Sequence, residues 1–399
     1  MTSVPRSWDY GTALVVVLAL ALRVYAVECA VPSDMWDAQD YRDLAQSLVH
    51  RHEYARIGNS GWDDGLVHRA YRPPGYPFFR AGLMVAFGEG PTPALYFNVV
   101  SEIVALCFVI AAARSASDRR GGLIAAVLFA PVILFVTNQL TESVSLAFAA
   151  VLTWGLVDRS VWRSRAHAIL MGSILGLAIL TRPISVFWAP ALAIDWWRSA
   201  DKSARRLAEA LGPLLALIGA WTLRNYLLFG TFVWSSTNLG VHNAAELHIP
   251  WARLTELRRS GLDEPRADRA LVREVVAVAV SQPYETFLLL KQRLTDLFSV
   301  SESNCVELEY SRTHVYAESP RMLDILHYSV LWLRMTHAVG VVGAFTAALR
   351  PAREAERRLL LPFVVFVVLQ CLISRGDVRL IAPLLPILTV LGAGLVNRG

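Results

Sequence analysis

The chain has 399 residues, of which 55% are hydrophobic and only 18% are charged. This balance is typical of a polytopic membrane protein and argues against a large soluble core. The net charge of +5 does not indicate nucleic-acid binding, because the basic excess lies in short loops between apolar segments. The sequence has no zinc-type Cys and His spacing and no glycine-rich phosphate loop.

About ten apolar segments recur along the chain, and each is expected to be a membrane span. They are 11–27, 94–113, 121–136, 142–157, 167–181, 183–197, 207–229, 326–349, 359–373 and 380–396. A span needs about 20 mostly apolar residues, so several segments require flanking residues to cross. Segment 11–27 is interpreted as a span and not as a signal peptide, because Arg23 interrupts it and only Arg6 is basic before it. The sequence predicts an all-α polytopic membrane protein.

Basic residues define the expected orientation. If Met1 is cytoplasmic, the inward connections contain Arg114, Arg119, Arg120, Arg159, Arg163, Arg165, Arg198, Lys202, Arg205, Arg206, Arg350, Arg353, Arg357 and Arg358. This agrees with the positive-inside rule and leaves segments 28–93 and 230–325 outside. We therefore expect a transmembrane module over 1–229 with outer loop 28–93, an outer segment over 230–325, and C-terminal spans over 326–399.

The first outer loop is expected to contain two helices. Over 37–50, Tyr41, Leu44 and Leu48 have the spacing of one helical face, whereas 51–72 is polar and is expected to be loop. Pro73 and Pro74 open an apolar stretch over 75–88 that is too short to span comfortably. This stretch is expected to be a juxtamembrane or re-entrant helix packed against protein.

The second outer segment is expected to begin as loop over 231–246, followed by amphipathic helices over 267–280 and from Pro283 onward. Phe287, Leu290 and Leu294 belong to an apolar stripe of the last helix, which favours a helix lying on the membrane surface. Cys29 and Cys305 both fall outside, where an oxidising compartment permits a disulfide; whether they pair is left open.

Asp37 and Asp40 are the first candidates for chemistry. They lie one helical turn apart just after the first span, so their side chains can share a face. A partly desolvated carboxylate has a raised pKa and can accept a proton from a hydroxyl. The structural alternative is an acidic helix start that is stabilised by the helix dipole.

Several arginines occupy the side of the membrane that the topology rule disfavours. Those near the outer ends of spans are Arg182, Arg224, Arg375 and Arg379. Guanidinium groups match phosphate in bidentate geometry, so a phosphate or pyrophosphate is one explanation. Contact with lipid headgroups, or pairing with carboxylates such as Glu142, is the other.

Five motifs in order resemble the bacterial C-type glycosyltransferases of the glycosyltransferase family 39-like group, related to protein O-mannosyltransferases and lipid A aminoarabinose transferases. They are Asp37-x-x-x-Tyr41, Arg72-Pro-Pro-Gly-Tyr-Pro77, Thr141-Glu142, Leu180-Thr-Arg-Pro183, and Leu223-Arg-Asn-Tyr-Leu-Leu-Phe-Gly230 followed by Ser-Thr-Asn-Leu-Gly240. The resemblance covers roughly residues 11–300. Each motif alone is weak, but their order is fairly specific.

The resemblance implies a C-type glycosyltransferase fold in which the first outer loop forms the active site. It implies a sugar on a polyprenyl phosphate as donor and Asp37 as general base. Candidates for holding the donor phosphate are Arg72, Tyr76, Glu142, Arg182, Arg224, Arg375 and Arg379, the last two on topology alone. Many relatives have an acidic Asp-Glu pair where this chain has Asp37-Ala38. Asp40 is the candidate for the second carboxylate, and neither a metal nor another cofactor is predicted.

These expectations together predict an inverting, lipid-linked glycosyltransferase of the cell (inner) membrane, with its site facing outside or the periplasm. Its partners are a polyprenyl-phosphate-linked sugar, an unidentified glycan, lipid or protein acceptor, and membrane lipids, but no nucleic acid. The alternative is a transporter or flippase for a lipid-linked or anionic solute. In that case the same arginines bind the substrate and Asp37 is a coupling group.

Overall fold

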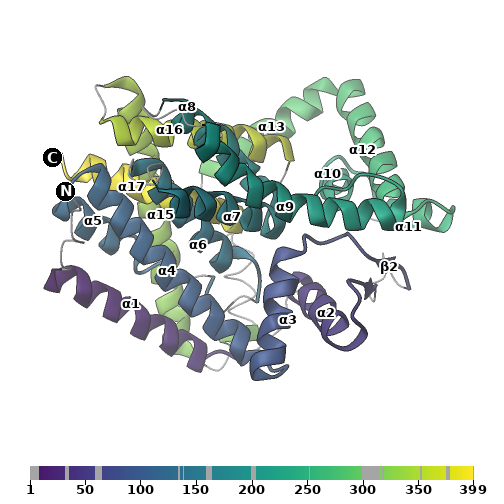
Figure 1. The fold of residues 1–399 in the computed structure, drawn as a ribbon, viewed down its shortest axis with the longest axis horizontal. Coiled ribbons are helices and arrows are strands. Elements are labelled where there is room, and N and C mark those ends of the chain that lie inside the picture. The colour runs from purple at the N-terminus through teal and green to yellow at the C-terminus, as the bar shows by residue number, and fades with distance from the viewer. Residues whose placement is uncertain are drawn as a thin grey trace.

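The computed structural model describes residues 9–31, 36–58, 65–133, 135–137, 139–158, 164–198, 204–250, 252–298, 314–316, 319–350, 353–373 and 378–398. These ranges are mostly helical (Figure 1). The helices are α1 (Tyr10–Glu28), α2 (Trp36–Arg51), α3 (Gly75–Phe87), α4 (Thr92–Ala116), α5 (Arg119–Phe129), α6 (Glu142–Val157), α7 (Arg165–Thr181), α8 (Trp188–Arg198), α9 (Ala204–Phe229), α10 (Leu239–Glu246), α11 (Ala252–Arg259), α12 (Glu264–Ser281), α13 (Pro283–Phe298), α15 (Pro320–Leu349), α16 (Glu354–Ile373) and α17 (Leu385–Val396). Two 3₁₀ helices, η2 (Pro183–Phe187) and η5 (Val378–Leu384), precede α8 and α17.

The prediction of several membrane-crossing helices is confirmed, without the individual spans. Among the described residues, four helices are long and apolar enough to cross a membrane: α1, α4, α9 and α15. The apolar helices α6, α7 and the stretch from Ile381 to Val396 are shorter. The chain is thus a multi-pass membrane protein, and the expected count of about ten spans stays a prediction.

Segment 121–136 forms a shorter helix than its hydropathy indicates. Its helix, α5, has only 11 residues, which corresponds to about 16 Å of helix. That length is about half of a bilayer core. The chain then leaves the helical path, and the described residues between 130 and 141 form turns, bends and irregular backbone. Irregular backbone at this depth must be buried in protein.

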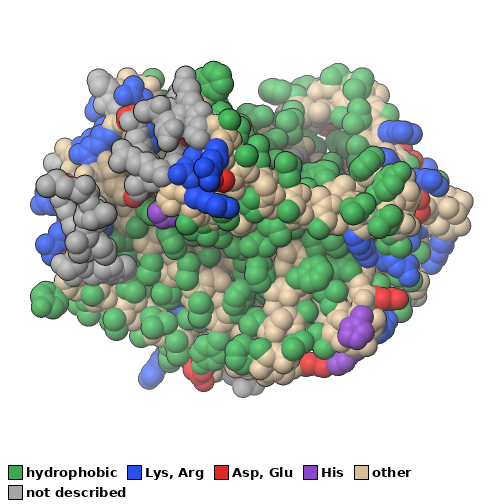
Figure 2. Space-filling view, in the orientation of Figure 1, with side chains coloured by type: hydrophobic (Ala, Val, Ile, Leu, Met, Phe, Trp, Pro, Cys, Tyr) green, Lys and Arg blue, Asp and Glu red, His purple; other side chains and the backbone are tan. Residues whose placement is uncertain are grey.

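The core is built by close packing of α4 with α6, α15 with α17, and α7 with α9. Glycines permit one of these approaches: a side chain at Gly343 would lie 2.5 Å from the carbonyl oxygen of Leu391 in α17. Small residues at such positions let membrane helices approach closely. Outward-facing residues of α1, such as Leu14 and Val17, are apolar and more than half exposed. Figure 2 shows apolar side chains spread over the middle of the visible face.

The two segments expected outside pack against each other at one end of the molecule, away from both chain termini (Figure 1). The buried carboxylate of Glu264 in α12 accepts hydrogen bonds from the backbone N–H groups of Arg69 and Ala70, at 2.7 and 3.1 Å. Arg258 in α11 donates to the carbonyl of Val67 at 3.0 Å. The segments therefore share one side of the protein; that this side faces outward stays a prediction.

Local structure in these segments is partly as expected. Helices were predicted over 37–50, 75–88, 267–280 and from Pro283, and α2, α3, α12 and α13 occupy those positions. Two loop predictions were wrong in part. The stretch 51–72 includes an antiparallel ribbon of β1 (Arg56–Ile57) and β2 (Val67–His68), and the stretch 231–246 ends in α10, which packs on α12. Both the ribbon and α10 contact residues that are distant in the sequence, in α11 and α12 respectively. Cys305 lies outside the described residues, so its pairing with Cys29 stays untested.

Candidate functional site

Asp37 and Asp40 share one guanidinium at the start of α2. Arg72 Nη2 lies 2.5 Å from Asp37 Oδ1 and 2.7 Å from Asp40 Oδ2, and Arg72 Nε donates to Asp40 Oδ2 at 2.8 Å. The two carboxylates thus lie on one helical face, as their spacing indicates. Arg56 Nε lies 2.6 Å from Asp40 Oδ1. Asp40 is therefore held between two arginines, whereas the side chain of Asp37 is 25% exposed.

Aromatic rings enclose this ion pair. The Arg72 guanidinium lies 5.1 Å from the ring centre of Tyr71 and 5.7 Å from that of Tyr41. Burial opposes the charge of Arg72, but Asp37 and Asp40 outweigh burial and hold the pKa of Arg72 well above its usual value. Burial raises the pKa of Tyr41 to about 12, although the nearby Arg72 lowers it. Arg72 is thus a permanent, oriented cation in a buried environment.

A second ion pair comes from the predicted spans. Arg182, in the turn between α7 and η2, donates through Nη2 to Glu142 Oε1 and through Nε to Thr141 Oγ1, the latter at 2.9 Å. Glu142 opens α6 and is almost fully buried. Its other oxygen, Oε2, is buried and has no hydrogen-bond partner among the described residues. A buried carboxylate oxygen of this kind requires a donor, such as a water or a ligand hydroxyl.

The motifs carrying these two pairs are in direct contact. A side chain at Gly75, in the Arg72 motif, would lie 2.4 Å from Thr181 Oγ1 and 2.9 Å from the backbone of Leu180, so only glycine permits this approach. The rings of Tyr41 and Tyr76 meet edge to face at 5.2 Å. The Tyr41 phenol lies within electrostatic range of Asp37 and Arg72 on one side and of Glu142 and Arg182 on the other. Sequence positions 37, 72, 142 and 182 therefore converge on one site.

Tyr76 adds a polar atom to this site. Its ring is almost completely buried, and its hydroxyl has no hydrogen-bond partner among the described residues. Burial raises the pKa of the Tyr76 phenol, so it is a neutral donor at physiological pH. Together with Glu142 Oε2 it offers one donor and one acceptor to a bound polar molecule. No grouping of three or more metal-ligating side chains occurs in the part of the chain that the structure describes.

The other predicted arginines are placed differently. Arg224 donates to the carbonyls of Arg69 and Tyr54 at 2.7 and 3.1 Å and to the side chain of Asn225. Among the described residues it has no direct contact with Asp37 or Arg182, but the ring of Tyr54 lies 5.6 Å from its guanidinium and the Tyr54 hydroxyl donates to the carbonyl of Arg72 at 2.9 Å. Arg375 lies outside the described residues, and Arg379 is described only as a backbone position in η5. Their predicted roles stay untested.

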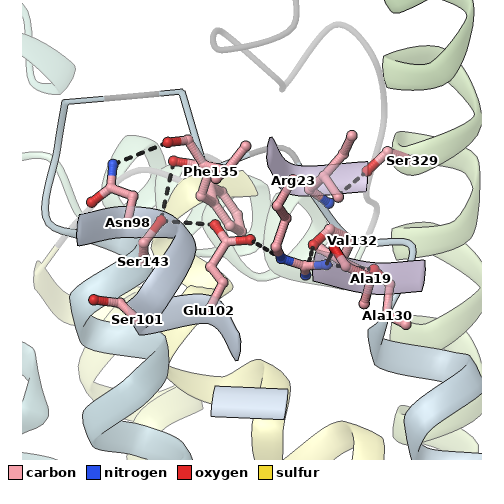
Figure 3. Close-up of polar contacts among 12 residues, drawn as sticks. Ala19, Arg23, Asn98, Ser101, Glu102, Ala130, Val132, Phe135, Ser143 and Ser329 are labelled. Carbon is pink, nitrogen blue, oxygen red and sulfur yellow. Dashed lines mark hydrogen bonds and ion pairs between the residues drawn. The ribbon is translucent and has the colours of Figure 1, made fainter. Parts of the chain in front are cut away.

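A buried polar network, which was not selected from the sequence, supports the site from within the membrane part (Figure 3). Arg23 of α1 and Glu102 of α4 form a salt bridge of 2.8 Å with exposures of 0% and 1%. Arg23 also donates to the carbonyls of Ala130 and Val132 at 2.9 and 2.7 Å. These are backbone groups that the end of α5 leaves without helical partners.

The network reaches the site through Ser143. Its hydroxyl lies 2.8 Å from Glu102 Oε1 and 3.1 Å from the carbonyl of Phe135. Because Ser143 follows Glu142, the same contacts hold the start of α6 in place. The sequence contained a signal for this network, since Arg23 and Glu102 are opposite charges inside two apolar segments. Charges inside a membrane are costly unless they are paired.

A comparison with protein-family models supports the resemblance that the sequence motifs indicated. Residues 71–224 match the family model described as dolichyl-phosphate-mannose-protein mannosyltransferase. The match confirms the resemblance to C-type glycosyltransferases and covers the motifs from Arg72 to Arg224. No curated protein matches the chain significantly.

Solved structures show the fold. The apo oligosaccharyltransferase of Archaeoglobus fulgidus is similar with a TM-score of 0.57 and 15% identity, over 98% of this chain and 51% of that one. The archaeal oligosaccharyltransferase AglB from Archaeoglobus fulgidus, in complex with an inhibitory peptide and a dolichol-phosphate, is similar with a TM-score of 0.55 and 14% identity, over 98% of this chain and 51% of that one. ArnT from Cupriavidus metallidurans bound to undecaprenyl phosphate has a TM-score of 0.45 and 14% identity, over 97% of this chain and 77% of that one. The chain thus spans about half the length of the archaeal structures, and the fold assignment rests on those two.

Proposed function

We propose that the chain is a membrane glycosyltransferase that moves a sugar from a polyprenyl-phosphate donor to a hydroxyl acceptor on the extracytoplasmic side. The observation that carries the proposal is the convergence of the Asp37–Arg72 and Glu142–Arg182 pairs around Tyr41. The family match over residues 71–224 supports a sugar-transfer chemistry for this site. Both fixed cations suit a departing phosphate, because they are oriented before the reaction.

Asp37 is the general base in this proposal. Its side chain is 25% exposed, against 8% for Asp40, so an acceptor reaches it more easily. The guanidinium of Arg72, with Nη2 at 2.5 Å from Asp37 Oδ1, orients this carboxylate. Asp40 is bound by both Arg56 and Arg72, which suits it to positioning Arg72 and Asp37.

The proposed step is a single inverting displacement. The acceptor hydroxyl gives its proton to Asp37 as its oxygen attacks the anomeric carbon. The bond from that carbon to the phosphate oxygen breaks, and the electron pair leaves with the polyprenyl phosphate. Arg72 and Arg182 stabilise the charge that develops on the phosphate. The Tyr76 hydroxyl and Glu142 Oε2, both without described partners, bind hydroxyl groups of the sugar.

The test compares two substitutions on the same helix. Asp37→Asn removes the proposed base, and Asp43→Asn makes the same chemical change at a side chain of similar exposure, 28%. Purified protein is incubated with radiolabelled polyprenyl-phosphate sugars and a cell-envelope extract. We expect Asp37→Asn to slow transfer by about 100-fold or more, with donor binding retained and Asp43→Asn close to wild type.

Two outcomes contradict the proposal. Turnover of Asp37→Asn within a few-fold of Asp43→Asn removes Asp37 as the base. Movement of the intact lipid-linked sugar across a vesicle membrane, without cleavage of the sugar–phosphate bond and with the same dependence on Arg72, favours the transporter instead. The two readouts are separable, because only transfer produces free polyprenyl phosphate.

A further inference from the structure

Arg80 of α3 joins the two halves of the site. Its side chain is buried, and the residue is only 3% exposed. Its Nη1 donates to the carbonyl oxygen of Ala38 at 3.2 Å, and its Nη2 donates to Gln139 Oε1 at 2.7 Å. Ala38 directly follows Asp37, and Gln139 lies three residues before Glu142. One guanidinium therefore bonds to both segments that carry the carboxylates of the site.

The helix that bears Arg80 contacts both halves along its length. Helix α3 packs against α2 and also against α4 and α7 (Figure 1). Tyr76, one turn before Arg80 on the same helical face, is also buried, and its ring meets that of Tyr41 in α2. Apolar packing of this kind tolerates small displacements. The two hydrogen bonds of Arg80 have narrow ranges of length and angle, so they define the relative position of α2 and Gln139 more closely.

The segment before α6 depends on side chains for its position. Its described residues between 132 and 141 belong to no helix or strand, so no regular ladder of backbone bonds holds them. Asn98 of α4 donates to the carbonyl of Val136 at 3.2 Å. Gln139, which is 2% exposed, accepts the hydrogen bond from Arg80. Of these two donors, Arg80 is the one that also bonds to α2.

A purely stabilising role explains why Arg80 keeps its bonds, because a buried guanidinium that loses its partners is costly. It does not explain where the bonds end. One acceptor adjoins Asp37, and the other lies one helical turn of sequence before Glu142. A displacement of about 1 Å can slow an enzymatic reaction by about 100-fold. The distance between the two carboxylate-bearing segments is therefore a quantity on which transfer depends.

We propose that Arg80 is a positioning residue for the transfer reaction. By tying the Asp37 turn of α2 to the segment before Glu142, it sets the distance between the two ion pairs of the site. The base in one pair and the phosphate-stabilising cation in the other then face the same bound donor. This role rests on the proposed function, because it presupposes the transfer step, and Arg80 acts through these segments and not on a reacting atom.

The experiment measures kcat and the donor KM of purified full-length variants. Arg80→Met removes both donors at roughly constant volume, Gln139→Leu removes one acceptor, and Gln139→Glu keeps an acceptor for Arg80. The matched control is Arg358→Met. Arg358 contacts the opposite end of α6, where it donates to the carbonyl of Leu156 at 3.2 Å and lies 3.3 Å from Asp195. Its side chain is 9% exposed, so both arginine substitutions break buried contacts and both are expected to lower the free energy of unfolding.

We expect Arg80→Met to lower kcat about tenfold or more, with the donor KM little changed, and Arg358→Met to leave both close to wild type. Gln139→Leu should also lower kcat, whereas Gln139→Glu should retain it. The double variant Arg80→Met/Gln139→Leu should be no slower than Arg80→Met alone, because both changes break the same link. If Arg80→Met does not fold, the comparison of Gln139→Leu with Gln139→Glu provides the same test.

Three results overturn the positioning role while transfer by the wild type is intact. They are equal kcat in Arg80→Met and Arg358→Met, a loss confined to donor KM, and a double variant whose loss is the product of the two single losses. Equal kcat in Gln139→Leu and Gln139→Glu has the same meaning. Absence of transfer by the wild type contradicts the proposed function itself, so the two failures are distinguishable.

Discussion

Replacement of Arg23 by Met tests how much of the fold depends on one buried side chain. The change keeps the volume of the side chain roughly constant but removes its guanidinium. Glu102, which is 1% exposed, loses its ion-pair partner, and the carbonyls of Ala130 and Val132 lose their donors. The hydroxyl of Ser143 still donates to Glu102, so the carboxylate is not left without any hydrogen bond.

The expected loss follows from these contacts. Breaking a buried ion pair on one side costs about 3–5 kcal/mol, and each orphaned carbonyl costs about 1–3 kcal/mol. The terms do not add, because they share one side chain. We therefore expect Arg23→Met to lower the free energy of unfolding by about 4 kcal/mol. A surface comparison is Arg119→Met, which breaks an ion pair with Asp9 at a side chain that is 72% exposed; its cost is below about 1 kcal/mol.

The assay is equilibrium unfolding in mixed micelles titrated with a denaturing detergent. Including the double variant Arg23→Met/Glu102→Leu separates two explanations. If only the ion pair matters, the double variant returns close to wild type, because apolar replacement of a buried pair is often neutral. If Arg23 also satisfies the irregular backbone after α5, the double variant stays about 2 kcal/mol less stable. A loss for Arg23→Met no larger than that for Arg119→Met would refute the reasoning.

Three further predictions concern other contacts. Burial raises the pKa of Asp268 to about 6 from 3.8. The folded state therefore binds more protons than the unfolded state between about pH 4 and 6, and its stability falls as pH rises through that window. Asp268→Asn should flatten this pH dependence when the free energy of unfolding is measured at pH 4.5 and 7. Gly75→Ala should reduce transfer at least tenfold, because its Cβ would meet Thr181 Oγ1 at 2.4 Å, whereas Gly82→Ala on the same helix has open space and should not. Gly343→Val should lower the thermal midpoint by separating α15 from α17, and an unchanged midpoint would show that this contact is dispensable.

The sequence was sufficient wherever function or structure depends on neighbours along the chain. The spacing of Asp37 and Asp40 placed both carboxylates on one face of α2, and the apolar stripe after Pro283 predicted α13. The motif order also indicated a resemblance to C-type glycosyltransferases, which the family match over residues 71–224 confirms. These features are local, because helical periodicity and motif residues are properties of short stretches.

Partners across the sequence were decided only by the tertiary structure. Arg182 and Arg224 both follow apolar segments and look alike in the sequence, yet Arg182 pairs with Glu142 whereas Arg224 binds backbone carbonyls. Segment 121–136 has the hydropathy of a span, but α5 ends at Phe129 and Arg23, more than 100 residues earlier, bonds the freed carbonyls. Local hydropathy indicates whether a segment can lie in the membrane. Which donor meets which acceptor depends on helix packing, and packing brings together residues that no local pattern links.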